Sequence, residues 1–191
     1  MEAHKLQLKF YLQPSSKPEL DTFVPVLHGV IREKKLGSEV LIDVADYSHV
    51  HEGPGIVLIG HEADYFIDAG EGRLGLLYNK KRGSAASLEA SVKDAFSCAL
   101  RMCAVLESSF QAAPLSFATD EALLRINDRL LATNTRAQFD ELRPALEGAT
   151  RSVYGSGVEL MQEGTPRELF TVRIKAAGAP RAADLHARLD A

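Results

Sequence analysis

The sequence predicts an α+β protein that folds as a single domain, with a mostly antiparallel, curved sheet of about seven strands and three main helices on it. Short segments of alternating or continuous apolar residues follow one another between turn residues, as they do in hairpins. Longer segments repeat their apolar residues at helical spacing. The 191 residues, 46% of them apolar and 25% charged, are enough for one ordinary globular core.

The first predicted elements are a strand and a helix. Residues 5–13 alternate apolar with polar side chains, which indicates a half-buried strand. The next segment, 20–31, has its apolar residues at helical spacing. Ser16 can cap this helix. Because Pro25 and Gly29 both weaken it, we expect the helix to begin late or to kink.

The strongest strand signal in the chain lies in residues 39–82. Alternating and continuous apolar runs are separated there by two turns, each with two glycines. We predict a three-stranded antiparallel meander over 39–50, 55–67 and 73–81.

The remaining chain predicts two longer helices and four strands. The clearest helix covers 88–108 and starts after Ser87. Another runs to about Val153, with Asn134 or Thr135 as its N-cap. Strands are expected at 115–119, 158–162 and 169–175, and also at 122–128, where a short helix is the alternative. The tail 177–191 is expected to form a short polar helix at the surface.

Two segments of the chain resemble each other. Residues 12–32 and 131–151 align without a gap, and 6 of the 21 positions are identical. Each contains the pattern P-x-L-x-G-x-x-R, at Pro25 and at Pro144. We interpret this as a duplicated strand–helix–strand–strand unit, over about 5–82 and 114–176, with the helix 88–108 as an addition. The alternative is a coincidence between similar elements.

Such a duplicated unit resembles, in its element order, the gyrase-inhibitor-like and SOUL-type ligand-binding folds. The resemblance implies two units in one curved sheet whose concave side holds an apolar ligand. It extends to the element order alone, because no residue motif of these families occurs in the chain.

Composition argues against several classes of protein. The net charge is −4 and the only basic cluster is Lys80-Lys81-Arg82, so we expect no nucleic-acid partner. No apolar run approaches 18 residues and the N-terminus has no signal-peptide core, so we expect no membrane association and a cytoplasmic location. Cys98 and Cys103 match no zinc or redox spacing and are expected to be reduced, packed thiols.

The meander contains the first candidate site. With the expected turns, Asp46 lies opposite His61, and His61 lies opposite Asn79. A carboxylate beside an imidazole fixes its tautomer and raises its basicity, as a general base requires. A buried histidine that only specifies the register of the sheet is the alternative. A shift of one residue in the strand pairing would exchange the two faces of the meander, and Asp46, His61 and Asn79 would no longer be neighbours.

A weaker candidate is a metal site at His49 and His51. Histidines two apart on a strand point the same way, and Glu62 or another carboxylate would be the third ligand for zinc or iron. The alternative is a solvated strand end beside a turn, and we expect no metal there.

The leading functional hypothesis is a small-molecule-binding module with a pocket between the sheet and the helices. Its ligand would be small and apolar or amphipathic, and Asp46, His61 and Asn79 would contact it. One alternative is an enzyme that uses His61 and Asp46 as a general base, with or without a metal. Another is a homodimeric interaction protein. The sequence identifies no cofactor.

Overall fold

The computed structural model describes residues 5–51, 53–83, 85–110 and 114–190. The strands are β1 (Leu6–Leu12), β2 (Leu41–Tyr47), β3 (Gly55–Gly60), β4 (Ala63–Asp68), β5 (Gly75–Lys80), β6 (Phe117–Ile126), β7 (Val158–Glu163) and β8 (Phe170–Ala176). The α-helices are α1 (Phe23–Arg32), α2 (Leu88–Ser109), α3 (Arg136–Tyr154) and α4 (Ala182–Leu189). Single 3-10 turns cover Leu20–Thr22 and Gly70–Gly72.

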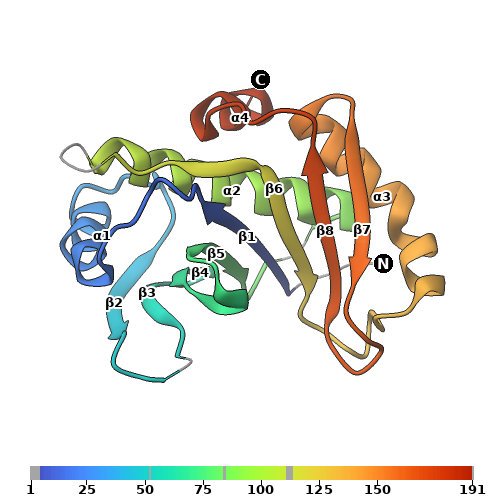
Figure 1. Ribbon diagram of the computed structural model, residues 1–191, viewed down its shortest axis with the longest axis horizontal. Helices are drawn as coiled ribbons and strands as arrows, with labels where there is room; N and C mark the ends of the chain where they lie inside the picture. Colours follow the sequence, from blue (N-terminus) through green and yellow to red (C-terminus); the bar gives the residue numbers. More distant parts are fainter. Residues whose placement is uncertain (1–4, 52, 84, 111–113, 191) are drawn as a thin grey trace.

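In the described part of the chain the eight strands form one antiparallel sheet that does not close (Figure 1). Their order is β2-β3-β4-β5-β1-β6-β8-β7, so β1 and β6 are neighbours near the centre and β2 and β7 are the edges. The prediction of a single α+β domain with an antiparallel sheet is confirmed.

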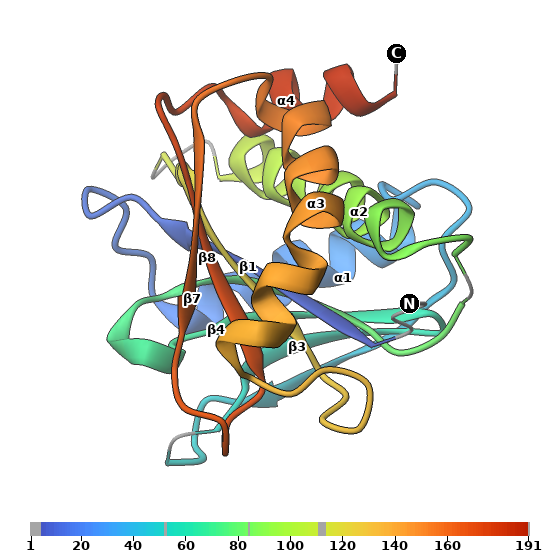
Figure 2. The ribbon, with the colours of Figure 1, turned by 90° about the vertical axis from the view of Figure 1, so that its right-hand side faces the viewer.

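The helices lie on one side of the sheet (Figure 2). Strands at the two ends of the sheet run in different directions, and α2 lies against the middle of the sheet. It packs on β1 and β5 and also contacts α3 and α4. Among the described residues, no helix combines the length and apolar character that a membrane crossing requires.

Local sequence signals explain where the two long helices begin. The Ser87 hydroxyl accepts a hydrogen bond from Ala90 N–H at 3.1 Å, and the Thr135 hydroxyl accepts one from Gln138 N–H at 3.3 Å. Each bond satisfies one of the amides that the first helical turn leaves unpaired. As expected from Pro25, α1 begins late, after a 3-10 turn.

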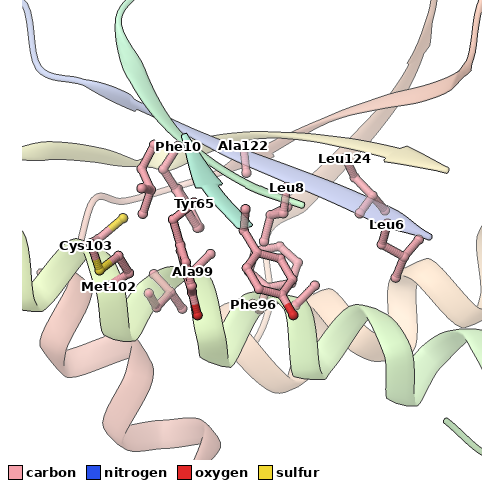
Figure 3. Close-up of a cluster of buried hydrophobic side chains, with 14 of the residues drawn as sticks. Leu6, Leu8, Phe10, Tyr65, Phe96, Ala99, Met102, Cys103, Ala122 and Leu124 are labelled. Carbon is pink, nitrogen blue, oxygen red and sulfur yellow. The ribbon is translucent and has the colours of Figure 1, made fainter. Parts of the chain in front are cut away.

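The main hydrophobic core lies between the sheet and α2 (Figure 3). Leu6, Leu8 and Phe10 of β1 point toward the helix, because alternate residues of a strand face the same side. The Phe96 side chain of α2 is fully buried and meets the Phe10 ring edge-on, with 6.0 Å between the ring centroids. Its other neighbour is the Tyr154 ring of α3, at 5.9 Å.

Two strand predictions are wrong in detail. The expected strand 55–67 is divided into β3 and β4 by a tight turn at His61 and Glu62. Gly60 permits this turn, because a Cβ there would lie 2.4 Å from the carbonyl oxygen of Ala63. The expected strands 115–119 and 122–128 are instead the single strand β6, which has a bulge opposite β1.

The C-terminal tail is less exposed than expected. Helix α4 packs on α2 and α3, and Ala182 and Leu185 are fully buried. The Thr119 hydroxyl of β6 donates a hydrogen bond to the carbonyl of Pro180 just before the helix. These contacts make α4 part of the core.

The two segments with the P-x-L-x-G-x-x-R pattern share their element order but not their helix geometry. In each, a central strand (β1 or β6) precedes a helix and then an edge strand. Pro25 lies in the first turn of α1, whereas Pro144 lies in the middle of α3. Four strands follow α1 before the next long helix, and two follow α3. The structure does not show a duplication.

Candidate functional site

The structure does not form the predicted row of Asp46, His61 and Asn79. Asp46 of β2 lies opposite Ile56. Strand β2 ends at Tyr47, earlier than the expected residue 50, and the two strands pair in a different register. His61 lies in the turn after β3, and Asn79 lies opposite Asp64 of β4. The register and the division of the expected strand at residue 60 together separate the three side chains.

Each of these side chains has other neighbours. Asp46 accepts a hydrogen bond from the backbone N–H of Ser48 at 2.8 Å. The His61 side chain is 51% exposed, and its Nε2 lies 3.5 Å from both Arg82 and Glu62. Asn79 accepts a hydrogen bond from Gln7 at 3.3 Å. An exposed imidazole lacks the buried carboxylate that fixes the tautomer of a general base.

The weaker metal candidates are also apart. His49 and His51 lie in the loop before β3, and Glu62 lies in the turn after it, so the length of β3 separates them. No group of three or more His, Cys, Asp or Glu side chains suited to a metal ion occurs among the described residues.

The space between the sheet and the helices, where a pocket was expected, is filled by the hydrophobic core. The opposite side of the sheet, which we call the open face, carries no α-helix in the described part of the chain (Figure 2). Two long polar side chains of β1 are nevertheless fully buried there, Lys9 and Tyr11, each at 0% exposure. Burial of a lysine is costly unless its charge is compensated.

The connection between β4 and β5 covers Lys9. We call this connection, residues 68–73, the strap. The Lys9 ammonium donates hydrogen bonds to Asp68 at 2.5 Å, to the carbonyl of Gly70 at 2.8 Å and to Glu71 at 3.0 Å. An ammonium has three donors, so all of its hydrogen-bonding capacity is used by the strap.

The strap is also held by charged residues of β6 and β8. Glu71 forms an ion pair with Arg125, and one nitrogen of Arg73, Nη1, donates to both carboxylate oxygens of Glu121 at 2.9 Å. The Arg73 guanidinium stacks on the Tyr11 ring, 3.8 Å from its centroid. Arg173 of β8 bonds both Glu121 and Glu163.

The backbone of β1 at Tyr11 lies close to β5 because the residue opposite Tyr11 is Gly75. A Cβ at Gly75 would lie 2.3 Å from the carbonyl oxygen of Phe10, so a larger residue would push the strands apart. Burial raises the pKa of Tyr11, and the nearby Arg173 offsets part of that rise. The tyrosine is therefore neutral and supports the strap through its ring.

Beside the strap, the open face is hollowed into a cavity of about 540 Å³, which we call the groove. Its charged lining comprises Arg125, Arg129, Arg167, Arg173, Glu71, Glu163 and Glu168. Its apolar floor includes Leu123 of β6, opposite Lys9, and Leu169 before β8. The volume is typical of sites for small molecules.

The charges in the groove are not fully paired. Arg125 pairs with Glu71, and Arg173 pairs with Glu163. Glu168 accepts a hydrogen bond from the backbone N–H of Thr165. Within the described part of the chain, the exposed Arg129 and Arg167 have no ion pair or hydrogen bond. The groove therefore offers two guanidinium groups to a ligand.

Arg129 and Arg167 come from different loops that are tied together. Asn134, which is 1% exposed, donates a hydrogen bond to the carbonyl of Glu163 at 2.7 Å and accepts one from Gln162 at 3.0 Å. Thr133 and Leu169 form an isolated β-bridge between the same loops. These contacts hold the loop after β6 against the β7–β8 turn, at the same end of the molecule (Figure 1).

A second cavity lies on the other side of the strap. It has a volume of about 420 Å³ and is lined by most of the strap together with Tyr47, Val50 and Ile67. Glu71 lines both cavities. The strap thus contributes residues to two separate hollows.

Acid is expected to destabilise the protein through this network. Burial alone would raise the pKa of Glu71 and Glu121, but hydrogen bonds from Arg125 and Lys9 to the first, and from Arg73 and Arg173 to the second, lower both pKa values. Their stabilising contribution is complete above the unfolded value of about 4.3 and is lost as the pH falls through the folded values.

Urea titrations at pH 6 and pH 3 would measure this loss of unfolding free energy. The variant Glu71→Gln should lose less between the two pH values than the unaltered protein, because one of the titrating carboxylates is gone. Equal losses in the two proteins would contradict the assignment.

Sequence reasoning missed the residues of the groove. Lys9 was expected on the wetter face of a half-buried strand, yet the strap buries it. The available signal was a charged residue in the middle of an apolar strand, at Arg125 in ALLRI and at Arg173 in FTVRI. A buried-strand arginine indicates a charged partner on the same face.

No protein-family model and no curated protein sequence matches the chain.

Proposed function

We propose that the protein binds a small amphipathic anion in the groove of the open face. The observation that carries the proposal is the pair of guanidinium groups, Arg129 and Arg167, without partners beside an apolar floor. The expectation of a small-molecule-binding module is kept, while its site moves from the helix side of the sheet to the open face.

Guanidinium chemistry supports an anionic group on the ligand. A carboxylate or phosphate can accept two parallel hydrogen bonds from one arginine, a geometry that a lysine cannot offer. Hydrogen bonds to charged groups contribute about 1.5–3 kcal/mol each. Because Arg129 and Arg167 are exposed before binding, their contributions should fall at the lower end of this range.

The floor supports an apolar portion. Leu123 is only 2% exposed and lies between Lys9 and Arg173 across the strands, so it forms a dry base under the charged rim. Leu169 also lines the cavity and is half-buried. A short acyl or alkyl chain could cover both leucines while its anionic head contacts the two arginines.

Three probes separate the contributions of charge and chain. We expect octyl phosphate to bind more tightly than inorganic phosphate, and octanol to bind least, in isothermal titration calorimetry. The double variant Arg129→Ala/Arg167→Ala should weaken octyl phosphate binding by about tenfold or more, since about 1.4 kcal/mol corresponds to tenfold. Affinity should also fall as the salt concentration rises.

The matched control removes two exposed arginines from α3, on the helix side, as Arg143→Ala/Arg151→Ala. It should leave the affinity for octyl phosphate within about twofold, a difference of less than about 0.5 kcal/mol. An equal effect of the two double variants would show that net charge alone attracts the probe, and the groove would lose its role.

The two alternatives have less support. An enzyme with His61 and Asp46 as general base requires a contact that the pairing of β2 with β3 prevents. A homodimer could use the edge strand β2, where Ile42 and the preceding Val40 are 60% and 62% exposed. However, the Asp43 carboxylate accepts a hydrogen bond from the Val44 N–H at 2.8 Å, which occupies one donor of that edge.

A further inference from the structure

Glu71 has an unusual backbone conformation for its residue type. Its φ of 58° lies in the left-handed region, which favours glycine. Gly72 follows with a φ of 69°. This conformation directs the Glu71 carboxylate to Lys9 and Arg125, two cations that belong to different strands of the sheet. The Glu71 carboxylate therefore lies between two cationic side chains.

The surroundings of the two cations differ sharply. The Lys9 side chain is 0% exposed, whereas the Arg125 side chain is 21% exposed and reaches the groove. If Glu71 left without replacement, Lys9 would keep at most Asp68 and the carbonyl of Gly70, and at least one of its donors would be unpaired away from water. A buried charge with an unmet donor is strongly unfavourable. Glu71 can therefore leave only when another anion arrives.

We infer that Lys9 and Arg125 form an anion subsite at the end of the groove, that Glu71 occupies it in the unliganded protein, and that the carboxylate or phosphate group of the ligand displaces Glu71. This inference rests on the proposed function and names the inner part of the same site. The displaced segment, between Ala69 and Arg73, contains two glycines and faces a cavity on each side.

Internal competition makes a specific prediction about affinity. The apparent affinity of a ligand that must replace Glu71 is its intrinsic affinity multiplied by the fraction of molecules in which the subsite is free. We expect Glu71→Gln to tighten the binding of octyl phosphate by about fivefold or more in isothermal titration calorimetry, because the neutral amide competes less well for the two cations.

Glu168→Gln is the matched control. It removes the same unit of charge from the same cavity, but among the described residues Glu168 forms no ion pair: its carboxylate bonds Thr165, and Arg125 acts on it only at longer range. Its effect on affinity should stay within about twofold, which reports the general electrostatic change alone. Equal changes in the two variants would overturn the inference, because they would show that the position of Glu71 between Lys9 and Arg125 is irrelevant.

Hydrogen exchange of the unaltered protein provides a second readout that needs no variant. Octyl phosphate should increase the exchange of the Arg73 amide, because movement of the strap breaks its hydrogen bond to the carbonyl of Gly70. Decreased exchange there would contradict displacement. If octyl phosphate binding is lost in Arg129→Ala/Arg167→Ala while Glu71→Gln has no effect, the proposed function stands and this inference fails. If neither the unaltered protein nor Glu71→Gln binds the probe, both fail.

Discussion

Phe96→Ala is expected to lower the unfolding free energy by about 3–5 kcal/mol, the range for removal of a buried phenylalanine. The ring is fully buried on α2 and contacts aromatic rings from two other elements, Phe10 of β1 and Tyr154 of α3. Its removal would leave a cavity at the point where the sheet meets two helices (Figure 3). Urea titration with an unchanged slope would measure the loss.

The control for this prediction is Leu130→Ala. The Leu130 side chain is 98% exposed, so its truncation should change the unfolding free energy by less than about 0.5 kcal/mol. A loss below about 1.5 kcal/mol for Phe96→Ala would be too small for the cavity expected in a packed core. That result would reject Phe96 as a core residue and favour a pocket wall on the helix side of the sheet.

Lys9→Met is the second substitution with a large expected effect. Removing one member of a buried ion pair costs about 3–5 kcal/mol, because the remaining charges stay desolvated. We expect about 2–4 kcal/mol here, since Asp68 and Glu71 keep 17% and 34% of their side-chain surface exposed and so retain part of their hydration. The methionine has a similar length and fills the space of the lysine stem.

The pH dependence distinguishes this electrostatic cost from poor packing. Lys9 is one of the cations that lower the pKa of Glu71, and the stabilisation that this pair provides is lost as the pH falls, so the difference between Lys9→Met and the unaltered protein should be smaller at pH 3 than at pH 7. A difference that is the same at both pH values would indicate a packing defect instead. Lys5→Met, at an exposed position just before β1, should be close to neutral at either pH.

Local patterns predicted the elements whose causes are local. The cap at Ser87 and the helical spacing that follows it predict α2, and Thr135 predicts the start of α3. Alternation in 5–13 predicts β1 and the side of it that packs on α2. These features depend on residues close in sequence, and their period or their turn chemistry appears in the chain itself.

Tertiary contacts decided where the strands end and which residues share a face. The approach of Gly60 to Ala63 divides the expected strand 55–67 and moves His61 into a turn, away from Asp46. Strand register depends on the total pairing across a sheet, so a small error in turn length relocates every side chain.

The groove shows the same limit most clearly. Nothing local to Lys9 indicates that Glu71, 62 residues later, will cover it, or that Arg125 will lie beside both. The sequence alone determined the α+β class, the long helices and the apolar face that packs on them. The site depended on charges brought together from β1, the strap, β6 and β8, because electrostatic pairing across a sheet depends on distance in space and leaves no period in the sequence.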